Sequence, residues 1–207
     1  MTDSSQTASA RIYLASTSPR RRELLHQIGV SHELLIAPAP AGEDEPQHPG
    51  EAAADYVQRT ALDKALRGHD WMRREELPPL PLLAADTSVI LQGQVLGKPA
   101  DQADAQRILT ALSGRTHEVH TAVVLMTQHG LRLQALSISQ VSFHTLSDQD
   151  IVRYCSSGEP YGKAGAYGIQ GLAGAFISRL NGSYTGVMGL PLFETAQLLK
   201  QAGLTVP

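Results

Sequence analysis

Two long strand patterns, over residues 117–127 and 131–144, dominate the second half of the chain. They are joined at His129-Gly130 and therefore predict a large antiparallel hairpin. The first half differs, because a strand at 11–15, a helix at 18–27 and a strand at 30–37 form a β-α-β unit. A sheet that contains both must be mixed. We expect an α/β fold with helices flanking one long mixed sheet, rather than a pure doubly wound parallel sheet.

Apolar periodicity and turn residues predict the remaining elements. The predicted helices cover residues 51–68, 101–112, 147–157 and 191–202. The predicted strands cover residues 82–85 and 175–180, with a hairpin over 88–97 that turns at Gln92-Gly93. The predicted irregular segments are a loop at 38–50, a flexible connection at 68–81 and a glycine-rich loop at 159–174.

The composition limits the classes of protein to consider. With 207 residues, 42% of them hydrophobic and 18% charged, the chain suits one large globular domain or two closely packed lobes. A net charge of −3 argues against binding to a nucleic-acid backbone. Cys155 has no partner for a disulfide, the first residues lack a leader pattern, and no apolar run suits a membrane span. We therefore expect a soluble cytoplasmic protein.

Three consecutive arginines open the helix at 18–27. Ser18 suits the N-cap and Pro19 the first helical position, so Arg20, Arg21 and Arg22 fall where the helix dipole is already positive. Ser16 and its neighbours add hydroxyl donors to the same turn. This arrangement favours an anion, with phosphate the natural candidate. The alternative is a solvated basic face that Glu23 partly neutralises.

A second group of residues could place an acid beside that anion. Asp86 follows the apolar run Leu82–Ala85, Lys64 lies on an otherwise apolar helix face, and Lys98 follows a glycine. A polyphosphate normally arrives with Mg²⁺, which one or two carboxylates hold together with phosphate oxygens. Asp86 could bind that metal or activate water, and Glu45 is a plausible second carboxylate. The alternatives are a turn-capping aspartate and ordinary surface charges.

Other chemistries have weaker support. The glycine-rich loop lacks the Walker A spacing, although its glycines permit close approach to a ligand and Gln170 offers an amide that can bind a base edge. His117 and His120 are three apart in a strand and point to opposite faces, which argues against a metal pair. Cys155 has no clear activating partner.

Six motifs in order, from about residue 11 to residue 200, resemble the Maf family of nucleotide pyrophosphatases. They are S-T-S-P-R-R-R-E-L-L, Y-V-Q-R-T-A-L-D-K-A, A-A-D-T-S-V-I-L-Q-G-Q-V-L-G-K-P, L-S-G-R-T-H-E-V-H-T-A-V, G-K-A-G-A-Y-G-I-Q-G and N-G-S-Y-T-G-V-M-G-L-P. The resemblance implies a single two-lobed domain over residues 11–207, preceded by a disordered tail at 1–10. It also implies a central cleft and a fold like that of inosine triphosphate pyrophosphatase.

The resemblance further implies hydrolysis between the α- and β-phosphates of a nucleoside triphosphate, with Mg²⁺, Mn²⁺ or Co²⁺, in a homodimer. Motif by motif, it assigns Ser16, Arg20 and Arg21 to the phosphate turn, and Lys163 to substrate binding. It assigns catalytic cleft positions to Glu45, Lys64, Asp86 and Lys98, with Asp86 as the catalytic acceptor and Asp86 and Glu45 as the metal ligands.

Three positions resemble the family branch that acts on dTTP and UTP. These are Arg20, Thr87 and Gln170, whereas the branch acting on 7-methyl-GTP tends to carry tryptophan and glutamate at the first and last. The chain departs from the family at Gly162, where members commonly have an aspartate before the lysine. Two alternatives stay open: a pyrophosphatase for 7-methyl-GTP or another non-standard nucleotide, and a nucleotide-sensing module linked to septum formation.

Overall fold

A computed structural model describes residues 11–38 and 45–206. In this part of the chain one seven-stranded sheet has the order β2-β1-β3-β5-β6-β7, and β4 also pairs with β3. The strands are β1 (Arg11–Leu14), β2 (Ser31–Leu34), β3 (Leu82–Leu91), β4 (Gln94–Leu96), β5 (Thr116–Met126), β6 (Arg132–Phe143) and β7 (Ile177–Asn181). β1 is parallel to β2 and β3, and every other pair is antiparallel. The predicted mixed sheet is confirmed.

Helices flank this sheet, as expected. They are α1 (Pro19–Gln27), α2 (Ala53–Arg74), α3 (Gln102–Leu112), α4 (Asp148–Ser156), α5 (Tyr184–Met188) and α6 (Leu192–Gln201), with short 3-10 turns η1 (Ala164–Ala166) and η2 (Leu172–Phe176). Asp101 caps α3, and Ser147 with Asp150 forms the capping box predicted for α4. No helix in residues 11–38 and 45–206 is long and apolar enough to cross a membrane.

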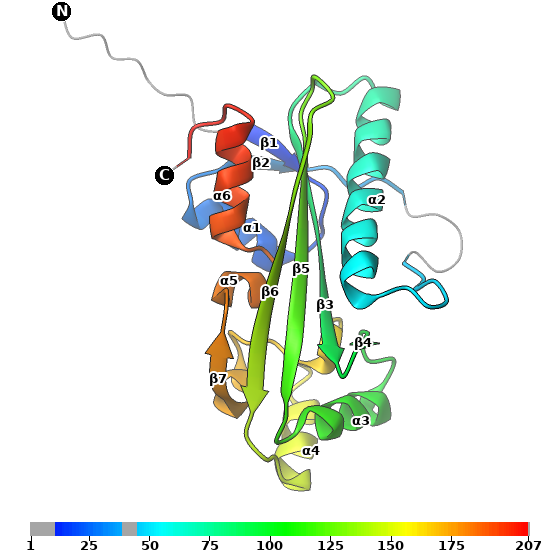
Figure 1. Cartoon of the computed structure of the whole chain (residues 1–207), viewed down its shortest axis with the longest axis vertical. Helices are drawn as coiled ribbons and strands as arrows, with labels where there is room; N and C mark the ends of the chain where they lie inside the picture. The colour runs from blue at the N-terminus through cyan, green and yellow to red at the C-terminus, as the bar shows by residue number, and fades with distance from the viewer. Residues whose placement is uncertain (1–10, 39–44, 207) are drawn as a thin grey trace, which may run out of the picture.

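The long strands β3, β5 and β6 run along much of the long axis of the molecule (Figure 1). The predicted hairpin of β5 and β6 is confirmed, with pairs from Thr116 and Ser142 to Met126 and Arg132. β1, β2, α1, α2 and α6 gather toward one end of these strands, and β4, α3, α4 and β7 toward the other (Figure 1). The long strands therefore join two lobes.

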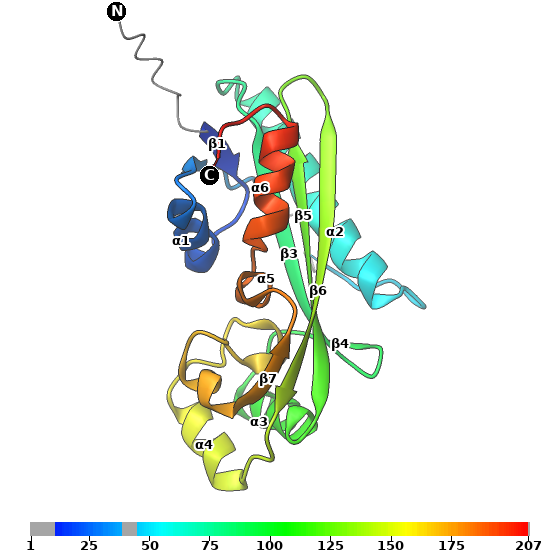
Figure 2. The same cartoon turned by 60° about the vertical axis from the view of Figure 1, so that its left-hand side comes forward.

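The two faces of the sheet carry separate hydrophobic clusters. Leu82 and Ala84 pack on one face with Val57 and Ala61 of α2. Leu83 and neighbouring odd-numbered residues of β3 pack on the other face with α1, α3, α4 and α6. Figure 2 shows α2 on the opposite side of the long strands from α1, α4 and α6. Strand alternation thus decides which helix each β3 side chain meets.

Helix α2 corrects one prediction, because it passes Gly68 and ends at Arg74. The first half of the predicted flexible connection at 68–81 is therefore wrong. Gly68 does not end the helix; it lies so close to the sheet that a Cβ there would be 2.9 Å from Leu82 Cδ1. Beyond it, Met72 is buried in the cluster under α2. Burial of this last stretch outweighs the low helix propensity of glycine.

Two smaller differences concern short elements. The strand predicted at 30–37 is limited to Ser31–Leu34, and helix α5 was not predicted. The predicted tail at 1–10 lies outside the described residues, as do Glu43 and Asp44 in the predicted loop at 38–50.

Candidate functional site

An uncovered stretch of the β3 edge positions the candidate site. β1 pairs with β3 at Leu82 and Leu83, and β4 pairs with the same strand from Val89 onward. Because β5 occupies the other edge of β3, β1 and β4 must share this edge. No strand covers β3 between these two pairings in the described part of the chain. Asp86 therefore lies within a ten-residue strand, and the prediction that it ends the strand is wrong.

A cleft of about 1010 Å³ opens along this edge. All ten residues singled out from the sequence line it, although they come from six separate segments. These are Ser16, Arg20, Arg21, Glu45, Lys64, Asp86, Thr87, Lys98, Lys163 and Gln170. Their convergence is a structural fact, whereas their chemical roles remain predictions.

Lys64 joins the two carboxylates of the cleft. Its Nζ is 2.7 Å from Asp86 Oδ1 and 2.6 Å from Glu45 Oε1. Asp86 is buried, with 6% of its surface exposed, and Ser88 Oγ lies 3.4 Å from its second oxygen. A lysine with two carboxylates leaves a net negative charge at this point, so the group is suited to bind a further cation.

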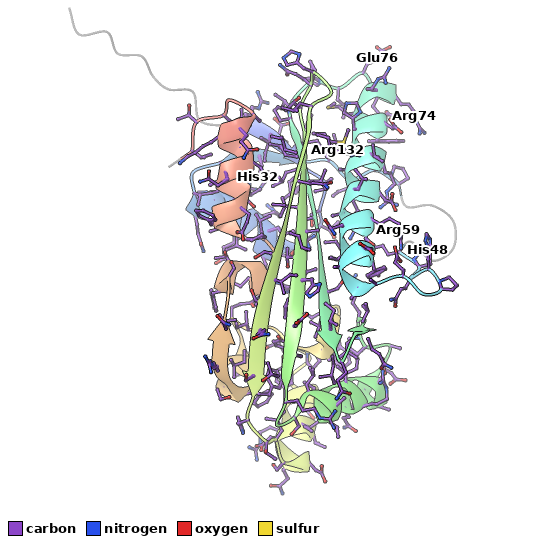
Figure 3. The ribbon with its side chains drawn as sticks, viewed as in Figure 1. His32, His48, Arg59, Arg74, Glu76 and Arg132 are labelled. Carbon is purple, nitrogen blue, oxygen red and sulfur yellow. The ribbon has the colours of Figure 1, made fainter. Side chains whose placement is uncertain are left out.

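Side chains of α2 hold the segment that carries Glu45. Arg59 bonds the Pro46 carbonyl at 2.8 Å and forms an ion pair with Glu51 at 2.6 Å, beside His48 (Figure 3). The Tyr56 hydroxyl donates to the Glu45 carbonyl at 3.1 Å. Burial and the nearby carboxylates Asp86 and Glu45 raise the pKa of Tyr56. Glu45 is thus supported from the helix that also presents Lys64.

The turn that carries the arginines forms a second wall of the cleft, across from the carboxylate pair. Arg21 donates to the Gly189 carbonyl at 2.8 Å, to Ser16 Oγ at 3.1 Å and to Thr87 Oγ1 at 3.2 Å. Arg20 Nε donates to the Met188 carbonyl at 3.3 Å. Burial lowers the pKa of both guanidinium groups, whereas Arg22 is exposed.

The start of α1 is consequently a concentration of positive charge. Ser18 occupies the N-cap position, but its side chain makes no capping bond, and the first turn contains no acidic residue. Neither Arg20 nor Arg21 forms an ion pair with a described residue. Around the whole cleft, the described lining has six lysine or arginine side chains and two carboxylates. A chain of net charge −3 thus presents a local cationic site.

The glycine-rich segment forms the third wall, where it packs tightly. A Cβ at Gly165 would be 2.7 Å from Val89, and Gly165 N donates to the Gly97 carbonyl at 3.0 Å. That bond joins the segment of Lys98, which is exposed, to the segment of Lys163. Burial first, and then Arg20, lowers the pKa of Lys163, whose ammonium donates to the Glu159 carbonyl. Gln170 also lines the cleft and is exposed.

One residue that sequence reasoning missed connects these walls. Thr121 on β5 lies opposite Thr87 in the β3–β5 register, is 1% exposed, and has its hydroxyl 3.0 Å from that of Thr87. It also bonds the Gly186 carbonyl of α5 at 2.8 Å. The sequence signal that could have identified Thr121 is a polar residue within an apolar strand pattern, next to His120.

The carboxylate pair is the candidate metal centre. No group of three or more His, Cys, Asp or Glu residues suited to a metal occurs in residues 11–38 and 45–206. Asp86 Oδ1 and Glu45 Oε1 both contact the Lys64 ammonium, and each carboxylate has a second oxygen. One or two carboxylate ligands of this kind suit Mg²⁺ or a similar ion whose other ligands are phosphate and water.

The structure also places the two histidines and the cysteine that the sequence analysis did not assign to the site. His117 packs on the α3 and α4 side with Phe143 and Tyr167, whereas His120 bonds Glu118 on the α2 side. They lie on opposite faces, as predicted. Cys155 is buried, and burial raises the pKa of its thiol, which opposes a role as nucleophile.

Comparison with known proteins identifies the family of the chain. The family described as Maf-like protein matches residues 11–202. A dTTP/UTP pyrophosphatase of Bordetella parapertussis is 68% identical, covering 95% of both chains. One of Ralstonia nicotianae is 54% identical, covering 94% of this chain and 95% of that one. A HAM1 protein of Coxiella burnetii has a TM-score of 0.47 at 17% identity, covering 93% of this chain and 99% of that one. The family match spans the whole cleft, and the chain belongs to the Maf family.

Proposed function

We propose that this chain hydrolyses dTTP and UTP to the nucleoside monophosphate and pyrophosphate. The observation that carries the proposal is the cleft, in which an arginine-rich helix start faces a lysine-bridged carboxylate pair. Relatives with 68% and 54% identity that are named dTTP/UTP pyrophosphatase support the choice of substrate.

The cationic walls suit a triphosphate. Arg20 and Arg21 add guanidinium donors to the free N–H groups of α1, and Lys98 and Lys163 approach from the glycine-rich side. Negative charge moves onto the departing pyrophosphate during the reaction, and fixed positive groups stabilise that charge without reorganising. Arg21 is held by three hydrogen bonds and is therefore already ordered for this role.

The carboxylate pair suits activation of water. Asp86, buried beside Lys64, accepts a proton as the water oxygen forms its bond to the α-phosphorus. The bond from that phosphorus to the bridging oxygen breaks, and its electron pair leaves with pyrophosphate. A divalent cation held by Asp86 and Glu45 would supply further charge neutralisation at the phosphate oxygens. Lys64 keeps the two carboxylates together on one side of the cleft.

The base is assigned to the mouth of the cleft. Gln170 presents an exposed amide with one acceptor and two donors, and Thr87 presents a hydroxyl near the arginine turn. Together they can bind the polar edge of a pyrimidine. The family resemblance also leads us to propose that the chain is cytoplasmic and forms a homodimer. Light scattering of the purified chain tests the oligomeric state.

A nucleotide panel tests the function. The purified chain is incubated with dTTP, UTP, 7-methyl-GTP and ATP, each with Mg²⁺, Mn²⁺ or Co²⁺, and pyrophosphate release is measured. Reaction in ¹⁸O-labelled water locates the attack, because attack at the α-phosphorus puts the label in the monophosphate. A preference for 7-methyl-GTP, label in the pyrophosphate, or nucleotide binding without any product would each contradict the proposal.

A further inference from the structure

Glu159 is a carboxylate that the proposed chemistry does not use, although three donors bond it. The Tyr154 hydroxyl donates to its Oε1 at 2.8 Å, and Leu172 N donates to its Oε2 at 2.9 Å. Ala173 N adds a longer bond to Oε1, at 3.5 Å. Tyr154 is buried on α4, whereas the two backbone donors open η2. Glu159 therefore joins two elements that lie on either side of the glycine-rich segment in the sequence.

These bonds close the part of the chain that carries two predicted substrate-binding residues. Glu159 and Leu172 bracket residues 160–171, which include Lys163 and Gln170. The Lys163 ammonium donates to the Glu159 carbonyl. At the other end, Leu172 N follows Gln170 by only two residues and donates to the Glu159 carboxylate. One residue thus fixes both ends of the segment.

The rest of the segment is packed around the same carboxylate. A Cβ at Gly171 would lie too close to both oxygens of Glu159, so any side chain there would displace the carboxylate. Gly168 N donates to the Tyr154 hydroxyl at 3.4 Å, and the hydrogen of that hydroxyl is donated to Glu159. Glu159 itself is not among the described residues that line the cleft. It can therefore act on a nucleotide only through its neighbours.

We propose that Glu159 is a positioning residue that closes the glycine-rich segment and so holds Lys163 and Gln170 in place to bind the nucleotide. The inference rests on the proposed function, in which these two residues contact the substrate. Asp86 lies on β3 and Arg21 on α1, whereas the bonds of Glu159 given above reach α4, η2 and the segment itself. A segment closed before the nucleotide arrives binds more tightly, because no binding free energy is used to order it.

The test measures binding of α,β-methylene-UTP, which cannot be hydrolysed between the α- and β-phosphates, by calorimetry. Glu159→Gln keeps the size but replaces one acceptor by an amide N–H₂, so a donor on Tyr154 or Leu172 loses its partner. We expect Kd to rise about tenfold, the size of one hydrogen bond. In a chain that already carries Lys163→Ala and Gln170→Ala, the same substitution should change Kd by less than about twofold, because the groups that it positions are gone.

Asp150→Asn is the matched control for the loss of a carboxylate. Asp150 lies on the same helix as Tyr154 and accepts bonds from Ser147 N and Oγ in the capping box. Its Kd should match that of the intact chain. Should Glu159→Gln not fold, Tyr154→Phe carries the test, since it removes one donor to the carboxylate and should raise Kd by a smaller factor.

Hydrogen exchange measured without ligand tests the closure directly. Residues 160–171 should exchange faster in Glu159→Gln than in the intact chain, and at the same rate in Asp150→Asn. Unchanged exchange or Kd in Glu159→Gln overturns the proposal, as does an equal rise in Kd when Lys163 and Gln170 are replaced. If Kd changes as expected but the intact chain cleaves neither UTP nor dTTP, the proposed function fails and the positioning role of Glu159 stands.

Discussion

Buried His117 should make stability depend on pH between about 6.5 and 4. His117 is 2% exposed, and the rings of Phe143 and Tyr167 pack edge-on against its imidazole at 5.2 Å and 5.4 Å between centroids. Its Nε2 bonds the Tyr167 hydroxyl at 2.8 Å, and its buried Nδ1 has no partner, so a second proton would find no acceptor. Burial lowers the pKa of His117 from 6.5 to about 4.

As the pH falls, His117 of the unfolded chain therefore binds this proton at a higher pH than His117 of the folded chain does. The stabilisation is fully present above the unfolded pKa and is lost progressively toward the folded one. Between pH 7.5 and pH 5.0 the two pKa values give a loss of about 2 kcal/mol in the free energy of unfolding. His117→Gln keeps a polar partner for Tyr167 but has no titrating ring, so its loss over the same interval should be about 2 kcal/mol smaller.

Urea unfolding at the two pH values measures both losses. Phe143→Leu is the matched control, because it disturbs the same cluster and leaves the imidazole in place. It should lower stability by about 1 kcal/mol at both pH values and keep the pH dependence of the intact chain. Equal losses in the intact chain and in His117→Gln would refute the argument that His117 is buried in its neutral form.

Three further predictions concern the cleft. Asp86→Asn keeps the shape but removes the charge, so kcat should fall about 100-fold or more, whereas Asp70→Asn at an exposed position of α2 should not change kcat. Near-normal turnover in Asp86→Asn would remove Asp86 from the mechanism. Gln170→Glu should reduce kcat/KM for dTTP and UTP relative to other nucleotides by about tenfold, and a retained preference in the nucleotide panel would exclude Gln170 from base recognition. Gly165→Ala should lower the free energy of unfolding by about 2–3 kcal/mol, because the new Cβ meets Val89. Gly162→Ala has a similar positive φ but open space around it, so it should lower the free energy of unfolding by only about 1 kcal/mol. Equal losses of the two variants in urea unfolding would contradict the close packing at Gly165.

The sequence predicted the elements whose signals are local. The turn at Gln92-Gly93, with φ of 52° and 81°, and the capping box at Ser147 depend on neighbouring residues and are confirmed. The role of Gly68 was predicted wrongly because it depends on tertiary packing. A glycine that ends a helix and a glycine that lets a helix approach a sheet look alike in sequence. Helix α5 was missed because five residues carry too little periodicity, although Ser183 caps it through Gly186 N.

The candidate site was predictable as a set of residues but not as a geometry. Asp86 and Thr87 are adjacent on β3, so their side chains point to opposite faces of the sheet. Asp86 meets Lys64 of α2, and Thr87 meets Arg21 and Thr121 on the other side. In the middle of a fully paired sheet these two side chains would belong to separate sites.

They share one cleft because the edge of β3 is open between the pairings with β1 and β4. A ligand at an open strand edge can contact side chains from both faces, as well as the turn that follows β1 and the glycine-rich segment packed beside β4. This arrangement separates the carboxylates from the arginine-bound threonine by the thickness of the sheet. Substitutions at Asp86 therefore act on the carboxylate side of the cleft and substitutions at Thr87 on the side of the arginine turn, although the two residues are neighbours in sequence.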